Sequence, residues 1–244
     1  MSPTFALLVP VKILARAKTR LEVTDAPSRS ALMRAFALDA LEAALRSPAV
    51  SQVYVVSEEP FALEGVTLLP DEGEGDLNRA IVRALERLPR PRPDQGVAAM
   101  CADLPCLVDA DLTAALSAGD THLHPTRWFV PDASGTGTTL LAAAPGAVLD
   151  PHFGPGSAAR HQQSGALAVD APLPSLRRDV DRVADLEVAR ALGLGPHSRA
   201  AWVAWTAQPA AQSAAQSMGQ SMGQSVGQSA ASPRPAGTTG PPVI

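Results

Sequence analysis

The sequence is poor in aromatic residues and in cysteine. Aromatics make up 4% of its 244 residues, so the core has to be built mainly from Val, Leu and Ala. The two cysteines, Cys101 and Cys106, match neither a CxxC zinc pair nor a thioredoxin motif. Cys101 ends an apolar run and is predicted to be a small buried hydrophobic residue. We therefore expect a protein of a reducing compartment, with a core large enough to fold unaided.

A long apolar run and an excess of positive charge are also missing. The N-terminal apolar stretch, Phe5 to Val11, is too short for a signal-peptide core or a membrane span. The formal net charge is -4, and basic residues are scattered apart from Arg90 and Arg92 in a Pro-rich loop. A nucleic-acid-binding face usually carries clustered basic residues. We therefore expect a soluble, cytoplasmic protein that binds neither nucleic acid nor a membrane.

The composition changes near residue 207. From there the chain repeats Gln-Ser-Met-Gly and then continues in Ala, Ser, Pro and Gly, with no apolar periodicity. Such a segment cannot bury enough surface to offset the entropy lost on ordering. The sequence therefore predicts one folded domain in residues 1–200 and a disordered low-complexity tail in residues 201–244.

Strand-like and helix-like segments alternate before the tail. The predicted strands are Phe5–Val11, Val53–Val56, Val66–Leu69, Val97–Cys101, Trp128–Val130 and Leu140–Ala143. The predicted helices are one capped by Ser28 and reaching Leu45, one capped by Asp76 over Leu77–Leu88, and the segments Asp109–Leu116, Ser157–Gln163 and Asp185–Leu192. This alternation predicts an α/β fold with a mostly parallel sheet and helices on both faces.

Ligands of such sheets bind at the carboxyl ends of the strands, so the candidate loops follow Val11, Leu69, Cys101, Val130 and Ala143. The first loop carries four cations, which suit a triphosphate: Lys12, Arg16, Lys18 and Arg20. It lacks the Gly-Lys-Ser/Thr of a Walker P-loop. The alternative is a solvated loop whose charges only add solubility, and composition leaves both open.

Acidic residues follow two of the predicted elements. Asp103 ends a buried strand, and its carboxylate is a suitable hard ligand for Mg²⁺. Asp179 and Asp181 alternate on an extended segment and would repel each other unless a cation lay between them. Turn or cap roles are the alternatives, and Asp185 is predicted to be a helix cap.

Two small-residue segments could bind anions. Asp132 is followed by the run Gly135–Thr139, although many hairpin turns look the same. The glycines of Phe153–Gly156 precede Ser157 at a predicted helix start, where Ser157 could also be a simple N-cap. Arg160 and His161 lie in the first helical turn, where cations are unfavourable, so something negative is expected nearby.

Taken in order, these motifs resemble the guanylyltransferases of deazaflavin coenzyme F-420 biosynthesis, small members of the nucleotide-diphospho-sugar transferase-like superfamily. The resemblance covers residues 3–195 and is carried by Val9-Pro10-Val11-Lys12, Ala17-Lys18-Thr19-Arg20-Leu21, Ala102-Asp103-Leu104-Pro105, Asp132 with Gly137-Thr138-Thr139, Phe153 through His161, Asp179-Val180-Asp181 and Asp185-Leu186. Each motif is weak alone, whereas the ordered set is specific. The family often has Gly-Leu-Asn where this chain has Asp76-Leu77-Asn78.

The resemblance implies a single Rossmann-like α/β domain, GTP as donor, and Mg²⁺ as cofactor. It further implies three groups of site residues: Asp103, Asp179 and Asp181 for the metal; Thr139, Gly154 and Ser157 for the acceptor; and Lys12, Lys18 and Arg20 facing the triphosphate. Lys12, Lys18 and Asn78 would be the nucleotide-binding residues, and the departure at Asp76 weakens the case for Asn78.

The acceptor is expected to be a phosphorylated carboxylic acid. Relatives are associated with phosphoenolpyruvate, 2-phospho-L-lactate or 3-phosphoglycerate, which differ by too little to distinguish from sequence. The Ala- and Arg-rich composition suggests an actinobacterial source, and for such a source the family resemblance implies phosphoenolpyruvate. Two rival functions remain. One is another nucleotidyltransferase, acting on a molybdopterin or a sugar phosphate, and the other is a GTP-binding protein without turnover. A homo-oligomer could form through an apolar hairpin around Trp128, predicted to be exposed.

Overall fold

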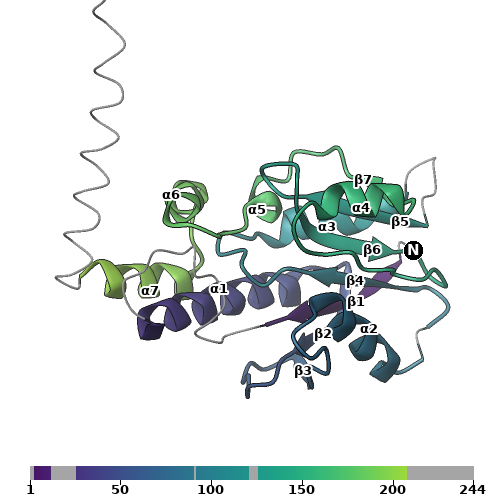
Figure 1. Cartoon of the computed structure of the whole chain (residues 1–244), viewed down its shortest axis with the longest axis horizontal. Helices are drawn as coiled ribbons and strands as arrows, with labels where there is room; N and C mark the ends of the chain where they lie inside the picture. Colours follow the sequence, from purple (N-terminus) through teal and green to yellow (C-terminus); the bar gives the residue numbers. More distant parts are fainter. Residues whose placement is uncertain (1–2, 12–25, 91, 121–125, 208–244) are drawn as a thin grey trace, which may run out of the picture. The chain divides into compact units, whose positions relative to one another are not determined.

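One sheet organises the part of the chain that the computed structural model describes, which is residues 3–11, 26–90, 92–120 and 126–207 (Figure 1). Its order is β3-β2-β1-β4-β6-β5-β7. The strands are β1 (Thr4–Pro10), β2 (Val50–Val56), β3 (Val66–Leu69), β4 (Gln95–Met100), β5 (Arg127–Pro131), β6 (Thr138–Ala143) and β7 (Leu167–Ala168). The predicted mostly parallel sheet is confirmed.

The helices are α1 (Ala26–Arg46), α2 (Leu77–Arg87), α3 (Asp109–Leu116), α4 (Ser157–Gln163), α5 (Pro174–Arg177), α6 (Val183–Leu192) and α7 (Pro196–Thr206), with a 3-10 turn, η1, at Ser117–Asp120. The sequence did not predict α5, α7 or β7. No helix among the described residues is long and apolar enough to span a membrane.

Strand β1 is an interior strand of the sheet, between β2 and β4, and is buried on both faces. Phe5, Leu7 and Val9 face a core formed with α1, α3 and α5. Ala6 and Leu8 face the opposite side, where they pack with residues of α2. An uninterrupted apolar run suits this position because neither face of the strand meets water. Helices therefore cover both faces of the sheet, as predicted.

Strand β6 runs against the direction of its neighbours. It pairs antiparallel with both β4 and β5, so that Met100 lies opposite Leu140 and Val97 opposite Ala143. The start of β6 thus meets the carboxyl end of β4. The residues directly after Ala143 therefore lie at the opposite end of the sheet, and the predicted ligand loop reaches the carboxyl end of β4 only in its later part, at Phe153.

Three predicted caps differ in the structure. Ser28 lies inside α1, which already includes Ala26. Gly156, in the left-handed region at φ 71°, is the N-cap of α4 in place of Ser157. Asp185 is the third residue of α6 and accepts from the backbone N–H of Arg182. Only the Asp76 cap is confirmed, since its carboxylate accepts from two amides of α2.

The hairpin around Trp128 is not an exposed surface. Trp128 is 2% exposed, and its indole N–H donates to the carbonyl of Ala115 at 2.8 Å. Its ring also meets Phe5 edge to face, with the two centroids 5.8 Å apart. The prediction of exposure is therefore wrong, and the suggested oligomer loses its basis at this hairpin.

The chain divides into two units, Met1–Ala204 and Trp205–Ile244, and only residues 205–207 of the second are described. Helix α7 continues across the predicted domain boundary at residue 200. The predicted disordered tail lies otherwise outside the described residues and stays a prediction.

Gly96 tests the packing of the sheet. A Cβ at this position would lie 2.4 Å from the Phe5 ring and 2.7 Å from the Ala143 carbonyl oxygen, so Gly96→Ala has to displace β1 or β6. We expect the free energy of unfolding to fall by about 1–3 kcal/mol in urea titration. Thr67→Ala, an exposed change on the edge strand β3, is the control and should stay within about 0.5 kcal/mol of wild type. Equal effects of the two substitutions would contradict the packing argument.

Candidate active site

A cavity of about 190 Å³ lies between the carboxyl ends of β1 and β4. The strand order reverses at this point, because β2 and β3 extend from one side of β1 and β4 lies on the other. Such a switch point is where open α/β sheets bind ligands. Its lining is apolar apart from Asp103 and Cys101 and comprises Pro10, Val11, Met33, Ala37, Leu77, Ile81, Met100, Cys101, Ala102, Asp103 and Phe153.

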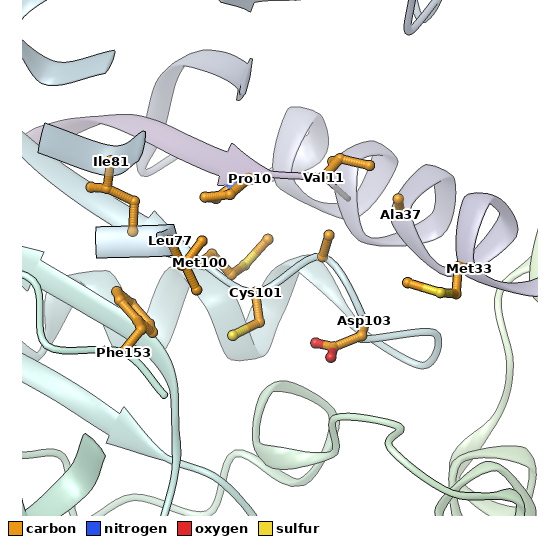
Figure 2. Close-up of a pocket in the computed structure, with 11 residues that line it drawn as sticks. Pro10, Val11, Met33, Ala37, Leu77, Ile81, Met100, Cys101, Asp103 and Phe153 are labelled. Carbon is orange, nitrogen blue, oxygen red and sulfur yellow. The ribbon is translucent and has the colours of Figure 1, made fainter. Parts of the chain in front are cut away.

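Figure 2 shows the Asp103 carboxylate near Met33 at one end of this cavity, and Ile81 and Phe153 near the other. Cys101 is half-buried, and its thiol donates to the carbonyl of Thr138 at 3.4 Å. Cys101 is therefore less buried than predicted, because the chain leaves the sheet at this residue to form the cavity wall.

Three carboxylates meet beside the cavity. Asp103, Asp179 and Asp181 each offer an oxygen, and these oxygens all lie within 4.8 Å of one another. Asp103 and Asp179 are half-buried, and Asp181 is exposed. Carboxylate oxygens are the ligands that hard divalent cations prefer, and an arrangement of this kind would otherwise be repulsive. The chemistry of the donor set therefore fits a divalent metal ion.

Val180 holds the last two of these carboxylates in place. Its side chain is fully buried, and its backbone N–H donates to the carbonyl of Asp103 at 3.0 Å. Because side chains alternate along an extended segment, burying Val180 directs Asp179 and Asp181 together to the other side. The hydrogen bond sets them level with Asp103. Sequence reasoning found the alternation and missed the anchor.

Asp185 fixes the turn that follows. Its carboxylate accepts from the backbone N–H groups of Asp181 and Arg182, at 3.2 and 2.9 Å. The other carboxylate oxygen lies 4.0 Å from the Arg178 guanidinium. Asp185 therefore contributes to the position of Asp181, as well as to the start of α6.

A second group of residues surrounds the loop from His152 to Gly156. Thr139, predicted to bind the acceptor, is fully buried, and its backbone carbonyl accepts from the Cys101 N–H at 2.9 Å. Ser157 is also buried, and its N–H donates to the carbonyl of Gly154 at 3.0 Å. Gly154 has φ 112°, a conformation that L-residues rarely adopt. Thr139 is therefore bonded to the cavity residue Cys101, and Gly154 and Ser157 follow the cavity residue Phe153 closely in the chain.

The hairpin loop after β5 is closed by hydrogen bonds to the side chain of Asp132, one of its own residues. Asp132 accepts from the Thr136 N–H at 3.0 Å and from the Ser134 hydroxyl at 2.9 Å. The carbonyl of Thr136 in turn accepts from the Ala158 N–H at 3.1 Å. The structure gives Asp132 the hairpin-turn role that the sequence left open.

Arg160 braces the glycine loop from within. Its guanidinium donates to the carbonyls of His152, at 3.0 Å, and Phe153, at 3.2 Å, and also to that of Pro155. The negative partner expected for this arginine is therefore the loop's own set of carbonyl oxygens. Positions 154 and 156 have positive φ, which turns these carbonyls toward one side.

His161 is a neutral, fully buried residue. Burial is the main cause that lowers its pKa to about 4. Its Nε2 accepts from the His152 N–H at 2.9 Å, which leaves the ring proton on Nδ1 to donate to the Thr138 hydroxyl, also at 2.9 Å. The expectation of a cationic His161 is therefore wrong, because desolvation in this core favours the uncharged ring.

Asn78 lies on the first turn of α2, beside Leu77 of the cavity wall. Its side-chain amide makes two hydrogen bonds to the backbone of Phe153. The predicted triphosphate residues Lys12, Lys18 and Arg20 lie outside the described residues, so their roles stay predictions.

A second acidic group lies away from the cavity and serves as a helix cap. The two carboxylate oxygens of Asp39 accept from the N–H groups of His197 and Ser198 in α7, at 3.1 and 2.7 Å. His197 also contacts Glu42 at 2.8 Å. A side chain of α1 therefore caps α7. The chain before α7 packs closely on this carboxylate, since a Cβ at Gly195 would lie 2.3 Å from the Asp39 carboxyl carbon.

The chain is similar to known proteins over most of its length. The family model described as "Guanylyl transferase CofC like" matches residues 5–164. A phosphoenolpyruvate guanylyltransferase of Thermomonospora curvata is 48% identical over 81% of this chain and 88% of its own length. One of Streptomyces scabiei is 46% identical over 81% of this chain and 95% of its own length. A solved nucleotidyl transferase from Methanothermobacter thermautotroptrophicus covers 78% of this chain and 97% of its own, with a TM-score of 0.53 and 14% identity, a likeness of fold alone.

His161 makes stability depend on pH in a defined window. Below an unfolded pKa of about 6.5 the unfolded chain binds a proton that the folded ring resists until about pH 4, so acidification between these values favours unfolding. The free energy of unfolding should fall in this window by about 3 kcal/mol from this group. Urea titrations at several pH values should show a shallower dependence for His161→Gln. The same dependence in both proteins would contradict the assignment.

Proposed function

Because this chain belongs to the guanylyl transferase CofC-like family, we propose that it transfers the guanylyl group of GTP to phosphoenolpyruvate and releases pyrophosphate. Its relatives at 46–48% identity carry the name phosphoenolpyruvate guanylyltransferase and match about four fifths of the chain. The observation that carries the proposal is the meeting of three carboxylates at the switch point, beside an apolar cavity. A nucleotidyltransferase needs both features: carboxylates for the metal ion that binds the triphosphate, and an apolar cavity for an organic part of a substrate.

The chemistry is a displacement at phosphorus. An oxygen of the acceptor phosphate attacks the α-phosphorus of GTP, a new P–O bond forms, and the bond to the β-phosphate oxygen breaks. Pyrophosphate leaves with the electron pair of that bond, and the product is enolpyruvoyl-diphospho-guanosine. A phosphate dianion is already nucleophilic, so no general base is required. Two anions have to be brought together, which makes positioning and charge neutralisation the main tasks of the protein.

The chain's own residues divide these tasks. Asp103, Asp179 and Asp181 would hold Mg²⁺, which supplies positive charge to the reacting phosphates when bound. Lys12, Lys18 and Arg20 would add charge from the loop after β1. The apolar cavity residues would receive an uncharged part of a substrate and keep water from it.

The acceptor is proposed to bind at Thr139, Gly154 and Ser157. Gly154 and Gly156, both with positive φ, present a bend of the backbone at the start of α4. Thr139 is linked through its carbonyl to Cys101, two residues before Asp103, so an acceptor there would lie near the proposed metal. The place of the reaction would be an early step of coenzyme F-420 biosynthesis, in the cytoplasm. Self-association stays a prediction without a described surface.

The metal carboxylates give the most direct mutational test. Asp103→Ala, Asp179→Ala and Asp181→Ala should each lower turnover by at least about 10³-fold, since each removes a ligand of the ion that neutralises the phosphates. Circular dichroism and urea unfolding should stay close to wild type, because at least part of each side chain meets solvent. Asp170→Ala, at an exposed position, is a matched control and should keep full activity. An active Asp103→Ala would remove that residue from the site.

The substrates are tested by pyrophosphate release from GTP and Mg²⁺ with phosphoenolpyruvate, 2-phospho-L-lactate, 3-phosphoglycerate or no acceptor. We expect release that requires an acceptor, is fastest with phosphoenolpyruvate, and stops when EDTA removes the metal. Fastest release with another acid would keep the transferase and change its acceptor. Bound GTP with no release in any tube would favour the alternative, a GTP-binding protein without turnover.

A further inference from the structure

Both polar groups of the Asn78 side chain are committed to one residue of the glycine loop. Its Nδ2 donates to the Phe153 carbonyl at 3.1 Å, and its Oδ1 accepts from the Phe153 N–H at 2.6 Å. The pair resembles one rung of a β-ladder, made by a side chain in place of a neighbouring strand. It joins α2 to a loop 75 residues further along the chain.

Phe153 is the residue at which the cavity wall becomes the proposed acceptor loop. Its side chain lines the cavity and packs with Ile81 and Leu77 of α2. The next residue, Gly154, is a proposed acceptor ligand. The backbone of Phe153 therefore sets both the position of the aromatic wall and the direction in which the glycines leave it.

The first turn of α2 is itself held rigidly. The Asp76 carboxylate accepts from the N–H groups of Asn78 and Arg79, at 2.8 and 3.1 Å. This cap fixes the backbone from which the Asn78 side chain extends. From the other side, Arg160 donates to the same Phe153 carbonyl and His161 accepts from the His152 N–H. Phe153 is thus held between α2 and α4, and Asn78 is the contact from α2.

A side chain that recognises a base has to present its donor and acceptor to that base. Here the two hydrogen bonds of Asn78 already use one donor and one acceptor direction on the backbone. Asn78 is also not among the described residues that line the cavity. A paired contact to a base through the same donor and acceptor would require both of these bonds to break, which would release Phe153.

We propose that Asn78 is a positioning residue that holds the Phe153–Gly156 loop in its acceptor-binding shape, and that it does not select the guanine base. This inference rests on the proposed function, because the acceptor site is part of it. Asn78 would then act on the binding of the acceptor substrate, although it belongs to α2, the helix whose residues Leu77 and Ile81 line the cavity.

The kinetic test uses Asn78→Asp, which keeps the shape of the side chain and its acceptor oxygen. The second oxygen would face the Phe153 carbonyl, and repulsion there should displace the loop. We expect the KM for phosphoenolpyruvate to rise about tenfold, with the KM for GTP changed by less than about twofold. The preference for GTP over ITP and ATP should stay as in wild type. Asn78→Ala should give the same pattern.

Arg83→Gly is the matched control. It weakens α2 at an exposed position and leaves the Asn78–Phe153 pair intact, so the KM for phosphoenolpyruvate should stay near wild type. A changed nucleotide preference in Asn78→Asp, equal changes in both KM values, no change in either, or the same acceptor effect in Arg83→Gly would each overturn the inference.

Hydrogen exchange separates this inference from the proposed function. In Asn78→Ala, the backbone N–H groups of residues 152–154, 156 and 157 should exchange faster than in wild type, whether or not the protein turns over any acceptor. Unchanged exchange there would overturn the positioning role. A wild-type protein that releases no pyrophosphate with any acceptor would instead count against the proposed function, and the exchange result would still test the contact.

Discussion

Three negative charges held within 4.8 Å of one another set the main constraint on this fold. Such a group repels itself, so the backbone has to hold it before any cation can bind. The structure does this with an apolar side chain: Val180 is buried in the core and bonded to the Asp103 carbonyl, and its two neighbours are acidic. Part of the hydrophobic free energy of folding is therefore used to keep a high density of charge at the end of a sheet.

The reversed strand β6 gives the site its second half. If β6 were parallel to β4, Thr139, near the start of β6, would lie at the end of the sheet opposite the cavity. Because β6 is antiparallel to β4, Thr139 lies beside Cys101, directly after the carboxyl end of β4. The chain after β6 then has to return to this edge. It does so past Leu149 to Phe153, both of which pack in the core on the α2 side.

Most elements could be predicted because their signals are local: the apolar run of β1, the helical spacing of α1 and α2, and the Asp76 cap. The direction of β6 could not, since a buried strand has the same pattern in either direction. The environments of Arg160 and His161 were also missed. Their positions in a helix indicate charge, whereas their state depends on carbonyls and core residues that only the folded chain brings together. Asp103, Asp179 and Asp181 were grouped through a family resemblance, and their proximity in space is a property of the structure.

The cap that Asp39 provides to α7 has a consequence for how short this chain can be made. Asp39 is 4% exposed, and its two described backbone donors, His197 and Ser198, lie more than 150 residues further along the chain. A protein that ends before α7 would lose both hydrogen bonds to this carboxylate in the middle of α1, together with residues that pack against it. An expressed fragment therefore has to include the start of α7, at least through Ser198, to keep this cap.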